Sequence, residues 1–213
     1  MINPLLADWS TPFQIAPFNA ISDDDFAPAL DEALAAHDAE IAAIAQNVSP
    51  ASFENVVGAL ESAGSALDKV LSVFFTVAGA DSNSAREELQ RDFSPKLAAH
   101  FSRITANKAL FQRVQDVWAN RDVLNLTDEQ TRVLMLTHRG FVRAGAALTG
   151  VEDTRMAEIK SRLAELGTSF TQNLLADERS WFMELGETDL EGLPQFVMDT
   201  ARAAGEEKGA GGP

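Results

Sequence analysis

Residues 52–75 read SFENVVGALESAGSALDKVLSVFF, and the spacing of their apolar side chains decides the fold class. Phenylalanine, valine and leucine recur there at three- and four-residue steps, which is the period of a helix that buries one face. Ser49-Pro50 lies just upstream, a cap residue followed by proline at the first helical position, and this pair predicts where the helix begins. Small Ala63 and Gly64 leave room for close approach by another helix. The run therefore predicts one long, mostly buried helix.

The same helical period recurs on both sides of this run. Ser22, followed by three aspartates, predicts a helix at about 23–47, because a serine cap and carboxylates both stabilise the positive end of a helix. Further periodic stretches follow at 89–104, 107–118, 127–150 and 156–178. Six helical segments predict an all-α fold, an elongated multi-helix bundle.

The pattern changes after Arg179. The short apolar run Trp181–Leu185 predicts a β-strand, and one more helix is expected from Gln195 to about Ala204. A lone strand is not stable by itself, so this one is expected to belong to a sheet in the missing remainder of a larger protein. The expected organisation is an extended arm at 1–22, a helical domain at 23–179 and the truncated start of a following region at 180–213.

Composition limits the classes of partner. Lys and Arg number 17 against 32 Asp and Glu, so the net charge is −15, and residues 1–68 contain no Lys or Arg at all. A surface of that sign repels nucleic acid and anionic membrane headgroups. The chain has no cysteine, and its longest apolar stretch, Val70–Ala80, falls short of the ~20 residues that span a bilayer. We expect a cytoplasmic protein without a nucleic-acid or membrane partner.

Catalytic and metal-binding patterns are missing from the sequence. The three histidines are His37, His100 and His138, and none has a histidine four residues on or a glutamate three residues before it, as zinc-protease and di-iron helices require. Nucleotide-binding and serine-nucleophile motifs are also absent. Nothing places a partner beside any histidine, so each is expected to be a helix-face or capping residue. We predict no catalytic, cofactor-binding or metal-binding residue in this chain.

Seven short segments, in the same order along the chain, resemble the N-terminal region of the zinc metallopeptidase family that includes thimet oligopeptidase, oligopeptidase A and bacterial dipeptidyl carboxypeptidase. The likeness covers nearly the whole chain. Three segments, Ser72–Phe75, Val117-Trp118 and Arg139–Val142, resemble the dipeptidyl carboxypeptidase branch more than oligopeptidase A. The segments are NPLL at 3–6, DFAPA at 25–29, EIAAIA at 40–45, SFEN at 52–55 with ALESAG at 59–64, LFQRV at 110–114, RGFVRAGAAL at 139–148 and LGTSFTQN at 166–173.

The resemblance implies a clamshell enzyme in which this helical region forms one wall of a deep channel that admits short unfolded peptides. It also implies that a later catalytic region supplies His-Glu-x-x-His and a distal glutamate to one zinc ion, and no position here matches those ligands. The intact protein is then expected to be a monomeric peptidyl-dipeptidase or oligopeptidase, and this 213-residue chain an inactive fragment of it. The alternative is a self-sufficient helical module that binds a peptide or a partner helix in a groove.

Overall fold

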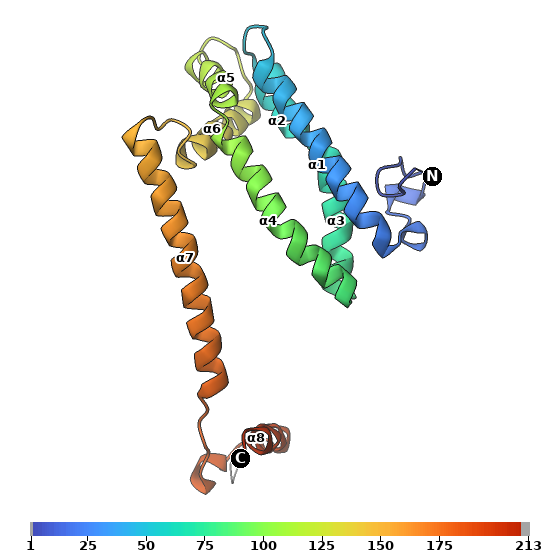
Figure 1. The fold of residues 1–213 in the computed structure, drawn as a ribbon, viewed down its shortest axis with the longest axis vertical. Coiled ribbons are helices and arrows are strands. Elements are labelled where there is room, and N and C mark those ends of the chain that lie inside the picture. The colour runs from blue at the N-terminus through green and yellow to red at the C-terminus, as the bar shows by residue number, and fades with distance from the viewer. Residues whose placement is uncertain (1, 210–213) are drawn as a thin grey trace. The chain divides into compact units, whose positions relative to one another are not determined.

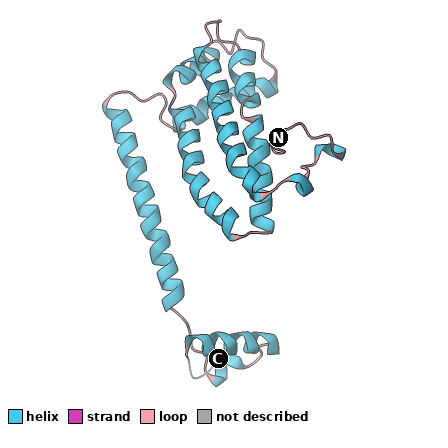
Figure 2. Cartoon of the chain, turned by 45° about the vertical axis from the view of Figure 1, so that its right-hand side comes forward, coloured by secondary structure: helices cyan, strands magenta, loops and turns pink. Residues whose placement is uncertain are grey.

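A computed structural model describes residues 2–209 of the chain, apart from the side chains of Glu178, Arg179 and Glu187. Every regular element in that range is a helix, and Figure 2 shows no strand among the described residues. The all-α fold predicted from the sequence is confirmed. The chain divides into two compact units, Met1–Gly150 and Val151–Pro213. The organisation expected from the sequence, with boundaries after residues 22 and 179, stays a prediction.

Helices make up almost all of the first unit. In Figures 1 and 2, α1, α3 and α4 lie alongside one another, and α5 and α6 gather where α1 ends. The elements are the short 3-10 helices η1 (Pro12–Gln14) and η2 (Phe18–Ala20), then α1 (Asp23–Gln46), the π-helical η3 (Phe53–Gly58), α2 (Ala59–Ser62), α3 (Ser65–Ala80), α4 (Ser84–Ala106), α5 (Lys108–Ala119) and α6 (Asp128–Arg143).

Helix α1 begins where its sequence predicts. The backbone N–H of Ser22 donates to the carboxylate of Asp25 at 2.7 Å, and the Ser22 hydroxyl donates to the same oxygen at 2.7 Å. These hydrogen bonds with Ser22 lower the pKa of Asp25. The three aspartates of the first turn lie at the positive end of the helix, where a negative charge is stabilising.

The long helix predicted from Ser49-Pro50 onward is wrong in two places. Its true cap is Ser52, whose hydroxyl accepts the N–H of Asn55 at 3.2 Å while the Asn55 side chain accepts the N–H of Ser52 at 2.9 Å. This reciprocal pair satisfies two amides at once, which a single serine followed by proline does not do. The helix is also broken between α2 and α3, where Ala63 is extended and Gly64 has a φ of 79°.

The break bears on how the apolar segment Phe53–Ala80 is interpreted. By length and composition alone, this segment qualifies as a candidate membrane-spanning helix. In the structure it is interrupted at Ala63 and Gly64, and Val57, Leu67 and Val70 within it are fully buried against other helices. Core helices of ordinary domains have the same composition, so the signal is weak.

The first unit contains two hydrophobic clusters, which succeed each other along α1. The first, which we call the α3 cluster, joins the first half of α1 to α3 and α4, and the second, the α5 cluster, joins the second half of α1 to η3, α5 and α6. The buried members of the α3 cluster are Leu5, Phe26, Ala29, Leu30, Ala33, Leu67, Val70, Val73, Phe74, Phe93 and Leu97. Those of the α5 cluster are Ile41, Ile44, Val56, Val57, Leu110, Val114, Val117, Leu134, Phe141 and Ala146.

Ion pairs follow the α1–α4 contact on its solvent side. Helix α1 contains Asp and Glu but no Lys or Arg, and α4 supplies the bases. The three pairs are Asp23–Arg86 at 2.7 Å, Asp31–Lys96 at 3.6 Å and Asp38–Arg103 at 3.1 Å.

The second unit consists of α7 (Val151–Ser180), the 3-10 helix η4 (Glu187–Leu190) and α8 (Gln195–Lys208). The helices predicted at 156–178 and from Gln195 are both present and longer than expected. The strand predicted at Trp181–Leu185 is not formed, since residues 181–186 have no regular structure. A strand needs a neighbouring ladder for its amides and carbonyls, and the described range contains none.

Candidate functional site

His37 of α1 and His100 of α4 contact each other in the interval between the two clusters. Nδ1 of His37 lies 3.0 Å from Nε2 of His100, and only 8% and 1% of these residues is exposed. On α1 the contact stands between Ala33 of the α3 cluster and Ile41 of the α5 cluster. Two polar rings therefore join α1 to α4 where the core changes from one cluster to the other.

A charged pair covers the outer side of this contact. Oδ1 of Asp38 lies 3.1 Å from Nδ1 of His100, and Oδ2 of Asp38 accepts a hydrogen bond from Nη2 of Arg103 at 3.1 Å. The side chains of Asp38 and Arg103 are 49% and 60% exposed, so water screens most of their attraction. Their main effect is to orient the His100 ring.

The turn between α2 and α3 is the third element at this level. The N–H of Gly64 donates to Oε2 of Glu40 at 2.7 Å, which ties the turn to α1. A Cβ atom on residue 64 would lie 2.9 Å from Cε1 of His37, so the histidine ring occupies the space that a side chain would need. The histidine junction, as we call this group, consists of His37, Asp38, Glu40, Gly64, His100 and Arg103.

The hydrogen-bond partners of the two rings determine which ring nitrogens carry a proton. The contact between the two rings requires one N–H donor and one lone pair. Because Asp38 accepts from Nδ1–H of His100, Nε2 of His100 is assigned as the acceptor and Nδ1 of His37 as the donor. Burial lowers the pKa of His100 below its ordinary value of 6.5, opposed by the charge of Asp38 and reinforced by His37 and Arg103. His100 is therefore neutral at physiological pH.

A small cleft of about 220 Å³ opens beside the junction, between α1 and α4. Asp38 and Arg103 belong to both the junction and the cleft, so the hydrogen-bonded rings and the cleft share a wall. The lining residues are Asp38, Ile41, Ala42, Arg103, Ile104 and Asn107.

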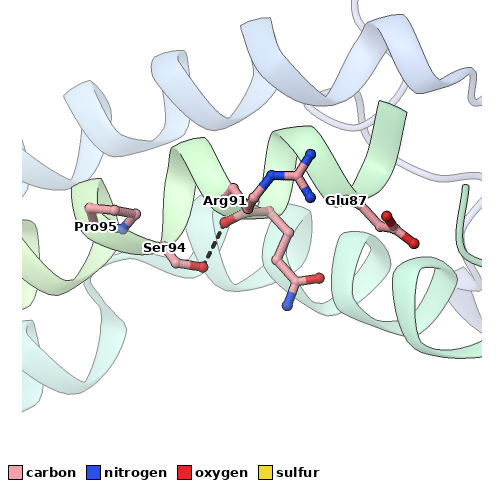
Figure 3. A pocket seen from close by; sticks show the side chains of 5 residues that line it. Glu87, Arg91, Ser94 and Pro95 are labelled. Atoms are coloured by element: carbon pink, nitrogen blue, oxygen red, sulfur yellow. Dashed lines mark hydrogen bonds between the residues drawn. The ribbon is translucent and has the colours of Figure 1, made fainter. Parts of the chain in front are cut away.

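Two larger hollows lie elsewhere on the first unit. One, of about 460 Å³, lies on the surface of α4 (Figure 3) and is lined by Glu87, Gln90, Arg91, Ser94 and Pro95. The hydroxyl of Ser94 donates to the Gln90 carbonyl at 2.6 Å, so its proton is held by the backbone of its own helix.

The other hollow, of about 530 Å³, lies beside the N-terminal arm and is lined by Asp8, Trp9, Gln14 and Lys69. The ammonium group of Lys69 lies 4.2 Å from the centre of the Trp9 ring and donates to the carbonyl of Ala7. Both interactions hold the arm against α3, which is a structural role.

His138 lies outside the junction, on α6. Its ring stacks on Trp118 of α5 with a centroid distance of 4.7 Å and an interplanar angle of 8°, and Nε2 lies 2.7 Å from Oε1 of Gln115. Burial lowers the pKa of His138, and the positive charge of Arg121 lowers it further.

Sequence reasoning missed the junction. It treated each histidine as a separate helix-face residue, whereas His37 and His100 contact each other across 63 residues of sequence. In the sequence, both histidines lie at helical spacing from apolar residues, which indicates that their rings are buried. A buried polar ring needs a hydrogen-bond partner, and this is the signal in the sequence that could have pointed to the junction. Among the side chains that the structure describes, no three of His, Asp or Glu are grouped so that they would hold a metal ion.

Comparison with known proteins relates nearly the whole chain to two kinds of peptidase. The chain is 36% identical to dipeptidyl carboxypeptidase of Salmonella typhimurium over 208 residues, which is 97% of this chain and 31% of that protein. Dipeptidyl carboxypeptidase of Escherichia coli is 34% identical over 98% of the chain and 31% of its own length. Oligopeptidase A of S. typhimurium is 26% identical over 98% of the chain and 30% of its own length. No protein-family model matches.

Two facts define the relationship. The chain spans about a third of the length of the relatives that it matches, and its identity to the dipeptidyl carboxypeptidases exceeds its identity to oligopeptidase A. Both agree with the resemblance found in its short segments. Nearly the whole chain is therefore homologous to about a third of dipeptidyl carboxypeptidase and of oligopeptidase A.

Proposed function

We propose that the chain is the N-terminal, channel-wall region of a zinc metallopeptidase of the peptidyl-dipeptidase type, which hydrolyses short unfolded peptides. The observation that carries this proposal is the 36% identity to a dipeptidyl carboxypeptidase over 97% of the chain. The helical architecture supports it, because packed helices form a rigid surface along which an extended peptide can lie. The two hydrophobic clusters hold the helices of the first unit against one another.

On this proposal the zinc ion belongs to the rest of the peptidase, where it would polarise the peptide carbonyl and activate water. The residues described here do not fit a zinc centre, since they include no group of three suitable ligands and the facing nitrogens of His37 and His100 bind each other. We derive no catalytic step for this chain, and we propose that it does not hydrolyse peptides by itself.

The remaining proposals concern the surroundings of the protein. A cytoplasmic location is supported by the absence of cysteine, and peptides are favoured over nucleic acid by the net charge of −15. We also propose that the intact peptidase is monomeric, as the resemblance implies.

A chimera tests the channel-wall role. This chain would replace the homologous stretch of E. coli dipeptidyl carboxypeptidase, and the product would be assayed with a blocked peptide that releases a C-terminal dipeptide. We expect hydrolysis that a zinc chelator abolishes. The matched control is the E. coli protein with that stretch deleted, which should be inactive.

The isolated chain is assayed in parallel and analysed for bound zinc. A chimera that folds, by circular dichroism and thermal melting, but cleaves no peptide would contradict the wall assignment and support the self-sufficient module. Hydrolysis by the isolated chain, with zinc retained after dialysis, would contradict the assignment of catalysis to the rest of the peptidase.

A further inference from the structure

The histidine junction holds two titratable rings in direct contact, and only some of their protonation states are compatible with that contact. When both rings are neutral, or one is protonated, an N–H of one ring faces a lone pair of the other. When both are protonated, every ring nitrogen carries a hydrogen. Two N–H groups and two positive charges then face each other across the 3.0 Å between Nδ1 of His37 and Nε2 of His100, and the hydrogen bond is lost.

The charged groups around the pair offset only part of this repulsion. From α1, Asp38 faces the outer nitrogen of His100 rather than the shared contact. From α4, Arg103 adds a positive charge, with Nη2 at 3.5 Å from Nδ1 of His100. One half-exposed carboxylate that already binds Arg103 cannot compensate two imidazolium rings.

The turn between α2 and α3 brings no charge to the contact. It meets the His37 ring through Gly64, which has no side chain, and its amide already occupies the carboxylate of Glu40. The ring of Phe101 packs against both histidines, with centroids 6.4 Å from His37 and 5.3 Å from His100, and it too is uncharged. A second proton on the pair is therefore unfavourable in the closed arrangement.

The position of the two rings in the fold determines which part of the structure responds when both are protonated. The hydrophobic clusters hold α1 on either side of the contact, so the effect is confined to the interval between Ala33 and Ile41. There α1 and α4 meet through the two rings, and the cleft lined by Asp38 and Arg103 lies directly beside them. Separation of the rings enlarges that cleft without unfolding either cluster.

We propose that the contact between His37 and His100 is a pH-dependent latch between α1 and α4, which is closed while at most one ring is protonated and opens, together with the adjoining cleft, when both are. The latch lies outside the proposed peptidase function and does not depend on it. A conformational response to two coupled histidines is a known use of this side chain in other proteins.

Hydrogen exchange of the 213-residue chain tests the latch without any activity assay. Protection of the amides at 33–41 and 96–104 is measured at about pH 7.5 and about pH 5, corrected for intrinsic exchange, and compared with amides at 110–117 in the α5 cluster. We expect the junction amides to lose about tenfold in protection at the lower pH and the reference amides less than about twofold.

Two variants make the test specific. In H37N the asparagine amide can donate a hydrogen bond to His100 or accept one from it, but it cannot be protonated. The junction amides of this variant should therefore lose less than about twofold in protection at the lower pH. H138Q removes the remaining histidine, which is partly buried, keeps its hydrogen-bonding position and leaves the junction intact, so it should respond as the wild type does. An equal loss in H37N and the wild type, or no loss in the wild type, overturns the proposal.

The imidazole nitrogens of the unmutated chain give an independent readout if H37N does not fold. In the wild type, NMR signals of the His100 ring nitrogens should change over the same pH range in which the junction amides lose protection. A loss of protection without a change at His100 overturns the latch.

Discussion

The ring of His37 and the backbone of Gly64 lie so close together that residue 64 has no room for a side chain. A Cβ atom there would lie 2.9 Å from Cε1 and 3.0 Å from Nδ1 of the histidine. Gly64 also has a φ of 79°, a conformation that residues with a Cβ rarely adopt. The turn between α2 and α3 is thus fixed by two separate requirements for glycine.

Gly64→Ala should destabilise the first unit. The substitution places a methyl group against His37 in a left-handed backbone conformation, and we expect the free energy of unfolding to fall by about 2–3 kcal/mol. Denaturant titration followed by circular dichroism measures this difference. Gly140→Ala is the control, because Gly140 lies in α6 with nothing within 4 Å of the position of a Cβ. That control should be neutral or stabilising by up to about 1 kcal/mol, and equal losses in both variants would contradict the steric explanation.

Arg113→Lys should weaken the attachment of α5 to the loop after α1. The guanidinium of Arg113 donates to the carbonyls of Asn47 and Ser49 and to Oδ1 of Asn55, and it is almost fully buried. Lysine cannot reproduce that planar set of donors, so we expect a loss of about 1.5–3 kcal/mol in unfolding free energy. The exposed Arg139→Lys in α6 provides the comparison and should change stability by less than about 0.5 kcal/mol.

Asp23→Asn should destabilise the start of α1 in a pH-dependent manner. The side-chain hydrogen bond from Asn83, and after it that from Arg86, lowers the pKa of Asp23 below 3.8. A carboxyl with a lowered folded-state pKa contributes stability above its unfolded pKa and loses it as the pH falls through the folded one.

We expect the substitution to cost about 0.5–1 kcal/mol near neutral pH, because Asp23 is partly exposed. The matched control is Asp24→Asn, which removes a charge from the same helical turn at an exposed position. The difference between the two variants, measured by thermal melting, should shrink as the pH falls below 3.8. A difference that persists under strongly acidic conditions would argue against the ionic origin.

Trp118 fluorescence should report the protonation of His138, on which it stacks. A protonated imidazole in contact with an indole quenches it, so emission should fall as the pH decreases. Burial and Arg121 lower the pKa of His138, so the midpoint should lie below 6.5. Because that folded-state pKa is lowered, the neutral, partly buried ring of His138 favours the folded state above 6.5, and this contribution is lost as the pH falls through the folded value.

The fluorescence measurement needs Trp9 and Trp181 replaced by phenylalanine, so that Trp118 is the sole emitter. Adding H138Q to that background should remove the transition. A transition that survives in H138Q would assign it to another group.

The sequence allowed prediction of those features that depend on neighbouring residues. Helix α1 begins at Asp23 as expected because Ser22 and Asp25, three residues apart, satisfy each other. The start of η3 was predicted three residues early because both Ser49 and Ser52 can cap a helix. The choice between them is made by Asn55 and by Arg113, which binds the carbonyl of Ser49 from 64 residues away.

Contacts between distant residues account for the remaining differences. The sequence analysis expected His37 and His100 to be separate helix-face or capping residues. Periodicity carries no information on which helix lies against which, so their hydrogen bond could not be foreseen. The expected strand at Trp181–Leu185 had the right composition, yet strands form by pairing, and no partner lies within the described residues.

The sorting of charge between α1 and α4 has a consequence for the order of folding. Residues 1–68 contain no Lys or Arg, so no hairpin made from this stretch alone can gain an ion pair from either side chain. The three ion pairs between α1 and α4 can form only when α4 has emerged from the ribosome, and the pairs Asp23–Arg86, Asp31–Lys96 and Asp38–Arg103 ascend in the same direction along both helices. Ion pairs therefore favour the parallel packing of α4 on α1. An earlier antiparallel pairing within residues 1–68 is not stabilised by any Lys or Arg ion pair.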